Sequence, residues 1–401
     1  MNYIKYAWDN IKHRKLRSFL TVLSILIGIA SIFTLVSFGQ GLTNYIDVIS
    51  SEVGTDKLII QSKGIGAPGT DENFFIKKEE VEFLSKINGM DEVAGVYFSV
   101  VQIKHDRSKK FVFMGSENMN NKKLIMELYT LKLHSGRDLK KGDNKKVVMG
   151  YNYLLPKKIY ETSLRMRDKI KINDEEFQII GFYEPVGNPQ DDSNIYITNE
   201  GFEILMPEKK NKFQFAIARV QEGINPRDMA EKAALKLRKF KSQKEGDEDF
   251  FIMTYEQLIQ TFNNILGVIN GVLVLIALIS LVVAGVNIMN TMYTAVLERT
   301  KEIGILKAIG AKNNNILMIF LVESGIVGLF GGILGISLGW GISTIGGRIA
   351  ADAGYQMLQP IFPVELVIGC LVFALLVGII SGLMPARQAS KLLPVDALRY
   401  E

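Results

Sequence analysis

The chain has 401 residues, of which 48% are hydrophobic and 22% charged, with a formal net charge of +5 and one cysteine. This modest charge lacks the strongly basic balance of a nucleic-acid-binding protein, so no nucleic acid partner is expected. A single cysteine cannot form an intrachain disulfide or a thiolate metal site. Cys370 is therefore interpreted as a small apolar packing residue, and no metal site is expected.

Four long apolar stretches are each free of charge over about the 20 helical residues that a bilayer requires. The first follows a basic segment, as in a signal peptide, but it is too long for one and no cleavage motif follows, so a retained anchor is expected. The fold class is thus an α-helical membrane protein with four transmembrane helices. They are predicted at residues 18–42, 258–297, 316–347 and 365–385.

Lysine and arginine in the short flanks predict the orientation of these helices. They are frequent in the N-terminal segment, in the loop at 298–315 and in the tail at 386–401, whereas Arg348 stands alone between helices three and four. These basic segments are expected in the cytoplasm. The short loop at 348–364 and the large region at 43–257 are expected outside, in a multi-pass protein of the cell membrane.

The first 17 residues form an expected cytoplasmic amphipathic helix. Ile4, Trp8 and Ile11 recur at helical spacing, and Lys5 and Lys12 accompany them. This pattern is typical of a helix lying on the inner membrane surface. The alternative is a frayed terminus.

The large region at 43–257 is predicted to be an extracytoplasmic α+β domain with two β-α-β units. The first unit is a strand at 57–61, a helix at 77–87 and a strand at 96–104. The second is a strand at 213–220, a helix begun by an Asn225-Pro226 cap, and a strand at 250–253. Between them we expect an insert, at about 111–197, with a hairpin turning at Asn173-Asp174.

Few groups in this domain indicate chemistry. Asp191, Asp192 and Asn194 could ligate a hard cation, although such clusters are more often solvated turns. His105 and His134 lie among lysines with no evident catalytic partner. We therefore expect a mechanical or recognition role for the domain.

The predicted helix at 258–297 would be about 60 Å long, which is twice the hydrocarbon thickness. Such a stalk could carry motion between the outer domain and the cytoplasmic loop.

The third predicted helix is rich in glycines spaced four residues apart. This spacing lets helices approach closely in lipid, so a tight packing face is expected, within one chain or across a dimer. The glycines are Gly328, Gly331, Gly332, Gly335 and Gly339.

Two further features of the third helix are ambiguous. Residues 335–339 match G-x-S-x-G, but a serine nucleophile needs a strand–turn–helix and a histidine base, so a hydrolase is disfavoured. Glu323 is an acid near the membrane, which by default suggests function. The alternative is that Glu323 lies at the inner interface and pairs with a lysine.

The loop at 298–315 is predicted to be a docking site for a partner protein. Its charges cluster where the second helix emerges, and an Arg299–Glu302 pair is possible at i, i+3 spacing. Ile303, Leu306 and Ile309 are expected on one face of a short helix that Gly310 ends. Charge reversal at Arg299 or Lys301, or Leu306→Asp, is expected to uncouple the partner. The predicted coupling residues are Glu298, Arg299, Lys301, Glu302, Ile303, Leu306 and Lys307.

The whole chain resembles the MacB/FtsX-like permease family, the membrane subunits of a class of ABC transporters. The resemblance is carried by "NIKHRKLRSFLTVLSILIGIAS", "LERTKEIGILKAIGAKNNNILMIFLVESGIVGLFGGILG" and "GLMPARQASKLLPVDALRYE". It implies a dimer of permease copies bound to cytoplasmic ABC ATPases, with the loop at 298–310 as the coupling element. It also implies a porter-like lobe and a mainly β insert in the outer domain, which moves with nucleotide state.

No G-x-x-x-x-G-K-[ST] phosphate loop occurs in the sequence, so no cofactor is expected in this chain, and ATP and Mg are expected on the partner ATPase. The expected function is ATP-driven export or extrusion of a peptide, drug or lipoprotein by mechanotransmission. The expected partners are the ATPase, a second permease copy, membrane lipid and an extracytoplasmic substrate or accessory protein. The alternative is a signal transmitter that controls an outer enzyme or sensor without transport.

Overall fold

The computed structural model describes residues 15–63, 74–356 and 358–399. Contacts divide the chain into two compact units, which we call the membrane unit (1–43, 264–350 and 358–401) and the α/β domain (44–263 and 351–357). The expected amphipathic helix at 1–17 falls mostly outside the described residues, and residues 15–17 belong to the first long helix.

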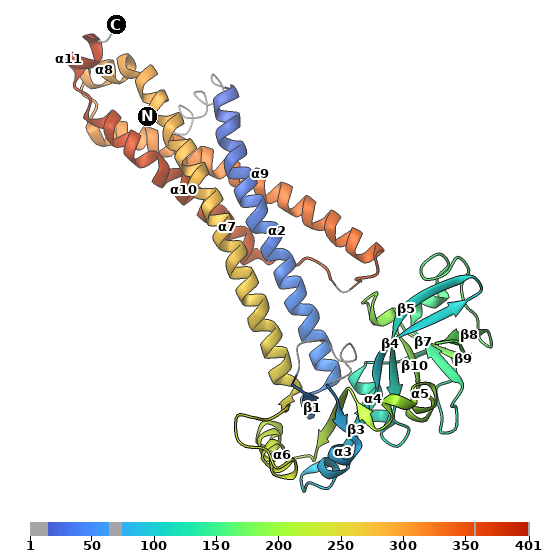
Figure 1. Ribbon diagram of the computed structural model, residues 1–401. Coiled ribbons are helices and arrows are strands. Elements are labelled where there is room, and N and C mark those ends of the chain that lie inside the picture. The colour runs from blue at the N-terminus through green and yellow to red at the C-terminus, as the bar shows by residue number, and fades with distance from the viewer. Residues whose placement is uncertain (1–14, 64–73, 357, 400–401) are drawn as a thin grey trace. The chain divides into compact units, whose positions relative to one another are not determined.

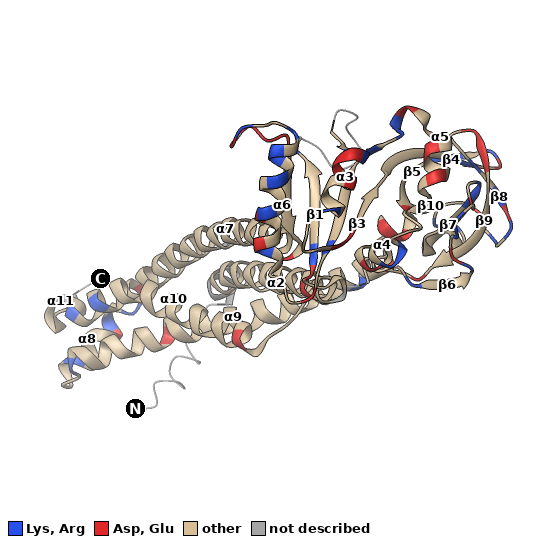
Figure 2. Ribbon diagram, turned by 90° about the horizontal axis from the view of Figure 1, so that it is seen from below, with Lys and Arg blue, Asp and Glu red and all other residues tan. Residues whose placement is uncertain are grey.

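Four helices are long and apolar enough to cross a membrane, as predicted. Figure 2 shows them almost free of charged residues between their ends. Each extends beyond its predicted range because hydropathy marks where an apolar run ends, not where the helical backbone ends. They are α2 (Lys15–Val53), α7 (Tyr255–Glu298), α9 (Asn313–Asp352) and α10 (Val364–Lys391).

Among the described residues, the membrane unit also has two short helices. Helix α8 (Thr300–Ala308) lies between α7 and α9, and α11 (Pro394–Arg399) follows α10. Helix α10 continues through Pro385, so the predicted tail is helical for most of its length. Figure 1 shows α8 and α11 side by side, and the two helices are in contact.

One glycine face of α9 packs against α2. A Cβ added to Gly331 would lie 2.7 Å from the Cβ of Ile25, and one on Gly335 would lie 2.8 Å from the Cβ of Ile29. Gly339 continues this face against Phe33. Since real Cβ atoms do not approach so closely, only glycine permits this separation of the two helices.

A second glycine face of α9 packs against α10. A Cβ on Gly328 would lie 2.5 Å from the carbonyl oxygen of Ala374, and one on Gly332 would lie 2.7 Å from the Ala374 Cβ. Gly378 on α10 lies against Gly328 on α9, since a Cβ added to Gly378 would lie 3.1 Å from the Gly328 Cα. The glycine spacing predicted one tight packing face, within one chain or across a dimer, whereas α9 uses its glycines on two faces, both within this chain.

Helix α7 contacts α2 differently, through polar side chains. The hydroxyls of Thr21 and Thr291 lie 3.1 Å apart, and Asn287 Nδ2 donates to Ser24 Oγ at 3.3 Å. Side-chain hydrogen bonds of this kind join helices in apolar surroundings.

The first lobe of the α/β domain is an antiparallel four-stranded sheet in the order β13-β1-β12-β3. Helices α3 and α6 cover one face and α4 covers the other. The Asn225-Pro226 cap is confirmed, since the Asn225 side chain accepts from Arg227 N at 2.9 Å. The elements are β1 (Lys57–Ser62), α3 (Lys78–Ser85), β3 (Met90–Val96), α4 (Lys122–Leu128), β12 (Phe215–Val220), α6 (Pro226–Phe240) and β13 (Phe250–Thr254).

The prediction for the last strand of the first unit was wrong. The strand that pairs with β12 is β3 (Met90–Val96), and the alternating run after Val96 belongs to the second lobe. Helices cover both faces of β3, so its residues 93–96 are all buried and show no alternation. A strand of this kind carries no period-two pattern to detect.

The second lobe is a small barrel. Its seven strands follow the order β6-β9-β7-β10-β5-β4-β8, and β8 also pairs with β9, which closes the sheet. The predicted hairpin turn is present, with positive φ at Asn173 and Asp174. The strands are β4 (Phe98–His105), β5 (Ser108–Glu117), β6 (Leu133–Gly136), β7 (Lys146–Met149), β8 (Lys169–Ile172), β9 (Glu175–Tyr183) and β10 (Ile195–Thr198).

Smaller elements join the two lobes. They are β2 (Ile76–Lys77), which pairs with β11 (Lys212–Phe213), helix α5 (Asn199–Leu205), and the 3₁₀ turns η1 (Tyr151–Leu154), η2 (Asp191–Ser193) and η3 (Pro207–Lys209).

Candidate docking helix and domain junction

Helix α8 is separated from α7 by one non-helical residue. Arg299 has φ −104° and ψ 16° and occupies the N-cap of α8. At the other end Gly310 has φ +98°, and the amides of Gly310 and Ala311 donate back to Lys307 and Leu306. This is the glycine stop that the sequence predicts.

Arg299 and Glu323 form a buried ion pair. Arg299 Nη1 lies 3.0 Å from Glu323 Oε2, and each side chain is 8% exposed. Arg299 therefore pairs with Glu323 and not with the predicted Glu302, because its guanidinium is directed toward the neighbouring helix α9. Glu323 does pair with a base, but with an arginine rather than the expected lysine. Removing either member of such a pair is strongly destabilising.

Lys307 is also turned inward. Its Nζ donates to the carbonyl oxygens of Ser390 at 2.5 Å and Leu392 at 2.6 Å, where α10 ends. The last carbonyls of a helix lack partners within the helix, and Lys307 satisfies two near this end. Burial lowers the pKa of the Lys307 ammonium.

The apolar residues of α8 divide between its two faces. Ile303 is 3% exposed and Leu306 packs against the membrane-unit core, whereas Ile309 is 77% exposed and Ile305 54%. The predicted face of Ile303, Leu306 and Ile309 is therefore wrong for Ile309. Ile309 follows Ile303 by six residues, which places it about 120° away around a helix of 3.6 residues per turn, and it lies beyond Ala308, the last residue of α8.

The seven predicted coupling residues thus fall into two sets. The inner set joins α8 to α9 and α10 and consists of Arg299, Ile303, Leu306 and Lys307. The outer set is exposed and consists of Glu298, Lys301 and Glu302, to which the structure adds Ile305 and Ile309. Nearby, α11 brings exposed Val395 to the same end of the membrane unit. Only the outer set can touch a partner directly.

A second cluster, which we call the junction cluster, lies in the α/β domain where α2 ends. Lys57 is 3% exposed, and its Nζ lies 2.9 Å from Asp56 and 3.0 Å from Glu127 and donates to the Val53 carbonyl. Arg219 on β12 binds Asp56 at 3.2 Å and also pairs with Glu127. Burial alone would raise the pKa of Glu127, but hydrogen bonds from Lys57 and Arg219 hold it below its usual value.

Apolar residues surround this network. Val53 at the end of α2 and Tyr255 at the start of α7 are buried together with Ile59 of β1 and packed by Leu128 of α4. The sequence analysis missed this cluster. Arg219 inside the apolar strand FAIARV was the available signal, because a buried arginine requires several acidic partners.

The remaining candidates do not form sites. Ser337 Oγ donates to the Ile333 carbonyl within α9 at 2.9 Å, so the G-x-S-x-G motif is helical and does not form a nucleophile elbow.

The acidic residues of the loop before β10 bind groups of that loop. Asp192 Oδ1 accepts from Val186 N at 2.6 Å, and Asp191 accepts from Asn188 and Asn194. These carboxylates hold the loop. In the part of the chain that the structure describes, no three His, Cys, Asp or Glu residues are grouped as metal ligands.

The two histidines and the cysteine have structural surroundings. His105 lies 3.6 Å from Asp106 and stacks edge-on against Tyr160, and His134 stacks against Tyr151. Cys370 is 4% exposed in the core of the membrane unit, as expected for a packing residue.

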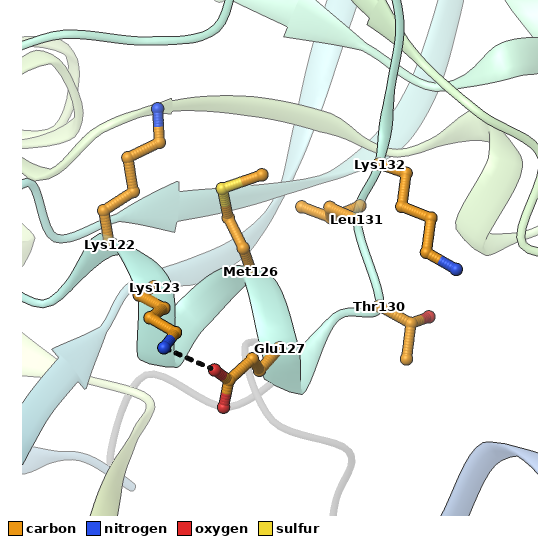
Figure 3. A pocket seen from close by; sticks show the side chains of 7 residues that line it. All are labelled: Lys122, Lys123, Met126, Glu127, Thr130, Leu131 and Lys132. Carbon is orange, nitrogen blue, oxygen red and sulfur yellow. Dashed lines mark ion pairs between the residues drawn. The ribbon is translucent and has the colours of Figure 1, made fainter. Parts of the chain in front are cut away.

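A pocket of about 530 Å³ lies beside α4, lined by Lys122, Lys123, Met126, Glu127, Thr130, Leu131 and Lys132. Figure 3 shows Lys122 and Lys132 extending to opposite sides of it, and Lys123 paired with Glu127. Lys122 already binds Asp138 at 2.8 Å and the Leu139 carbonyl at 2.6 Å. The cations do not converge, so the pocket lacks the geometry of an anion site.

Comparisons with known proteins match the two halves of the chain separately. Residues 18–235 match the MacB-like periplasmic core domain, and residues 274–394 match the FtsX-like permease C-terminal domain. An uncharacterized ABC transporter permease of Methanocaldococcus jannaschii is 37% identical over 403 residues, which covers 99% of this chain and 98% of that protein.

Other relatives and solved structures are more distant. The macrolide export ATP-binding/permease protein MacB of Neisseria gonorrhoeae is 29% identical over 397 residues, and the match covers 96% of this chain but 59% of that protein. The periplasmic region of MacB from Actinobacillus actinomycetemcomitans matches with a TM-score of 0.43 and 17% identity, over 53% of this chain and 95% of that one.

Proposed function

This chain belongs to the MacB/FtsX-like ABC transporter permease family, and we propose that it couples ATP hydrolysis by a separate cytoplasmic ATPase to movement of its α/β domain. The sequence has no phosphate loop, so ATP and Mg would bind the partner. The basic flanks support an orientation with both termini and α8 in the cytoplasm. The α/β domain would then face the outside.

The observation that carries this proposal is the two-sided construction of α8. Its outer face presents mixed charges together with Ile305 and Ile309, which suits docking into an apolar cleft with a polar rim. Its inner face is fixed to α9 by Arg299 and to the end of α10 by Lys307. A force applied to α8 would therefore reach three membrane helices without passing through a flexible loop.

Motion would continue to the α/β domain through the long helices. Helix α7 has 44 residues, or about 66 Å at 1.5 Å per residue. The junction cluster binds the end of α2 and the start of α7 to the sheet of the domain. We propose that this continuity supports mechanotransmission.

We propose that the functional permease is a homodimer. Large aliphatic side chains of α7 are exposed along much of its length, and α7 and α10 line an apolar groove of about 590 Å³. A second copy or membrane lipid would cover them. Residues that line the groove include Leu278, Val282, Val286, Phe373, Val377 and Ile380.

The substrate would be acted on from the outer side, where the α/β domain moves. Relatives are named for macrolide export, so a macrolide is the first compound to test. Peptides and lipoproteins are the other classes. ATP-dependent accumulation in inverted vesicles would support export, whereas an outer-surface enzyme switched by ATP without accumulation would support the alternative of a signal transmitter.

Docking can be tested by purifying the tagged chain from its native membranes in mild detergent and identifying bound proteins by mass spectrometry. We expect a stoichiometric ATPase with a phosphate loop, reduced at least tenfold in the Ile305→Asp/Ile309→Asp variant. Arg299 and Leu306 are unsuitable because both are packed inward, and their variants would disturb folding. Ile204→Asp is the matched control, since Ile204 is 55% exposed on α5.

The ATPase should bind the Ile204→Asp variant as it binds the unmodified chain. Normal ATPase binding by the α8 variant would contradict docking on α8. Absence of any ATPase from the unmodified chain would contradict the proposed function itself.

A further inference from the structure

The outer surface of the barrel has a face that none of the described elements covers. Along β4, Val101 and Ile103 point into the barrel core, and Val100 and Lys104 point outward. Directly opposite residues on neighbouring strands share a face. The register therefore places Phe113 beside Val100, Phe111 beside Gln102, and Lys109 beside Lys104 on one surface, which we call the open barrel face.

One end of this face is a row of three lysines on three adjacent strands. Lys104 on β4 lies opposite Lys109 on β5 and opposite Lys171 on β8. Like charges directly opposite each other destabilise a sheet. Among the described residues, neither Lys104 nor Lys109 is within ion-pair distance of an acid. Lys171 has Glu176 opposite it on β9, so it is the Lys104–Lys109 pair that works against folding, as residues kept for function do.

The next rungs of the same face are apolar. Phe111 is 72% exposed and Val100 is 40% exposed, although both lie within paired strands rather than in a loop. Phe98 and Phe113 stack beside them with ring centroids 5.1 Å apart. Two residues along a strand span about 6.7 Å, so Phe111 lies within one side-chain length of the lysine row.

From this juxtaposition we propose that the open barrel face binds an acidic segment of a partner polypeptide. An apolar side chain of the segment would pack on Phe111 and Val100, and its carboxylates would bind Lys104, Lys109 and Lys171. Exposed aromatic side chains are typical of interaction surfaces, and a group of like charges beside them favours a partner of opposite charge. The proposal does not depend on the ATPase or on transport.

Charge decides the chemistry of the occupant. A symmetric contact between two copies would bring the same patch of each copy together, and therefore two lysine rows into one interface. An acidic segment removes this repulsion and the repulsion within the row. A flat, pleated strand surface also suits a polypeptide better than insertion into a bilayer, which makes anionic lipid the competing outcome.

The test uses the full chain in detergent and a fluorescent glutamate-rich peptide with one central tryptophan. We expect binding by fluorescence anisotropy that weakens with salt. The Lys104→Glu/Lys109→Glu variant and Phe111→Ser should each weaken binding about tenfold or more, the scale of a hot-spot side chain. The matched controls on α6 are Lys236→Glu/Lys239→Glu and Leu235→Ser, since these side chains are exposed to solvent.

The thermal unfolding of each variant is measured in parallel. The lysine variant replaces one like-charge pair by another and sets the new carboxylate at position 104 opposite Lys171. It should therefore unfold no earlier than the unmodified chain, so weak binding would not reflect misfolding. Equal loss in the α6 controls, or no binding of the peptide, would overturn the proposal. Binding of phosphatidylglycerol vesicles through the barrel residues without peptide binding would also overturn it, in favour of lipid.

Discussion

Helices α7 and α9 have similar length and apolarity but are built for different neighbours. Half of the most apolar window of α9 is buried within the chain, compared with 6% of that of α7. Helix α9 achieves this with glycines that admit α2 on one face and α10 on another. Helix α7 carries large aliphatic side chains that are exposed in the described part of the chain. Mean hydropathy therefore shows that a helix can cross the membrane, whereas the sizes of its side chains show what it packs against.

The largest expected effect comes from filling a glycine face of α9. Gly335→Leu would place a side chain 2.8 Å from the Ile29 Cβ and 2.9 Å from the Leu26 carbonyl. Overpacking against backbone should cost about 3 kcal/mol or more, measured as loss of monodisperse protein after heating in detergent. Gly271→Leu on α7 is the matched control, because no atom lies within 4 Å of its added Cβ. Equal loss in both variants would show that α9 is not the more tightly packed helix.

The next effect concerns the ion pair that links the end of α7 to α9. Arg299→Met removes the partner that lies 3.0 Å from Glu323 and leaves a buried carboxylate without this ion pair. Such single losses cost about 3–5 kcal/mol, read from thermal unfolding. Adding Glu323→Met should recover most of the loss because no buried charge then remains. A double variant as unstable as the single one would show that the two residues do not act as a pair.

The exposed face of α7 predicts contact between copies. Val282 is 67% exposed in the groove beside α10. A Val282→Cys variant in a Cys370→Ala background should give a crosslinked dimer with a short bis-maleimide in native membranes. Ile345→Cys on α9, where Ile345 is 59% exposed, is the control for random collision. Similar crosslinking of both positions would indicate that α7 has no preferred neighbour.

The smallest effect is expected at the polar contact between α7 and α2. Thr291 Oγ1 donates to the Asn287 carbonyl within its own helix and lies 3.1 Å from the Thr21 hydroxyl of α2. Thr291→Val should cost about 0.6 kcal/mol, the average for interhelical hydrogen bonds in membranes. Thr294→Val is the control, since its hydroxyl donates to the Asn290 carbonyl of its own helix. A loss above about 2 kcal/mol would make this contact a main support of α7.

Local patterns in the sequence predicted the local features correctly. Hydropathy located the four membrane helices, residue spacing located α3 and α6, and glycine spacing located the packing faces of α9. Gly310 and Asn225 marked a helix end and a helix start because their backbone conformation and capping depend on adjacent residues. The strand β3 was not predicted, because both of its faces are buried and its sequence therefore lacks an alternating pattern.

The geometry of the candidate docking helix was predicted only in part. The sequence located α8 and its charges, but Arg299 was assigned to Glu302, and Ile309 was assigned to the buried face. The first error arises because the partner of Arg299 is on another helix, at Glu323 of α9. The second arises because a spacing of six residues turns Ile309 about 120° away from Ile303. The junction cluster was missed because Lys57, Glu127 and Arg219 are far apart in the sequence.

The sequence by itself determined that this chain crosses a membrane on four helices, carries an α/β domain between the first two and presents a short charged helix between the next two. These features depend on the hydropathy, charge and turn preferences of neighbouring residues. Only the tertiary structure decided which of the charges are structural. Arg299 and Lys307 look as exposed in the sequence as Lys301, but their partners are contributed by α9 and by the end of α10. Burial of an ion depends on what is packed around it, and no local pattern records that.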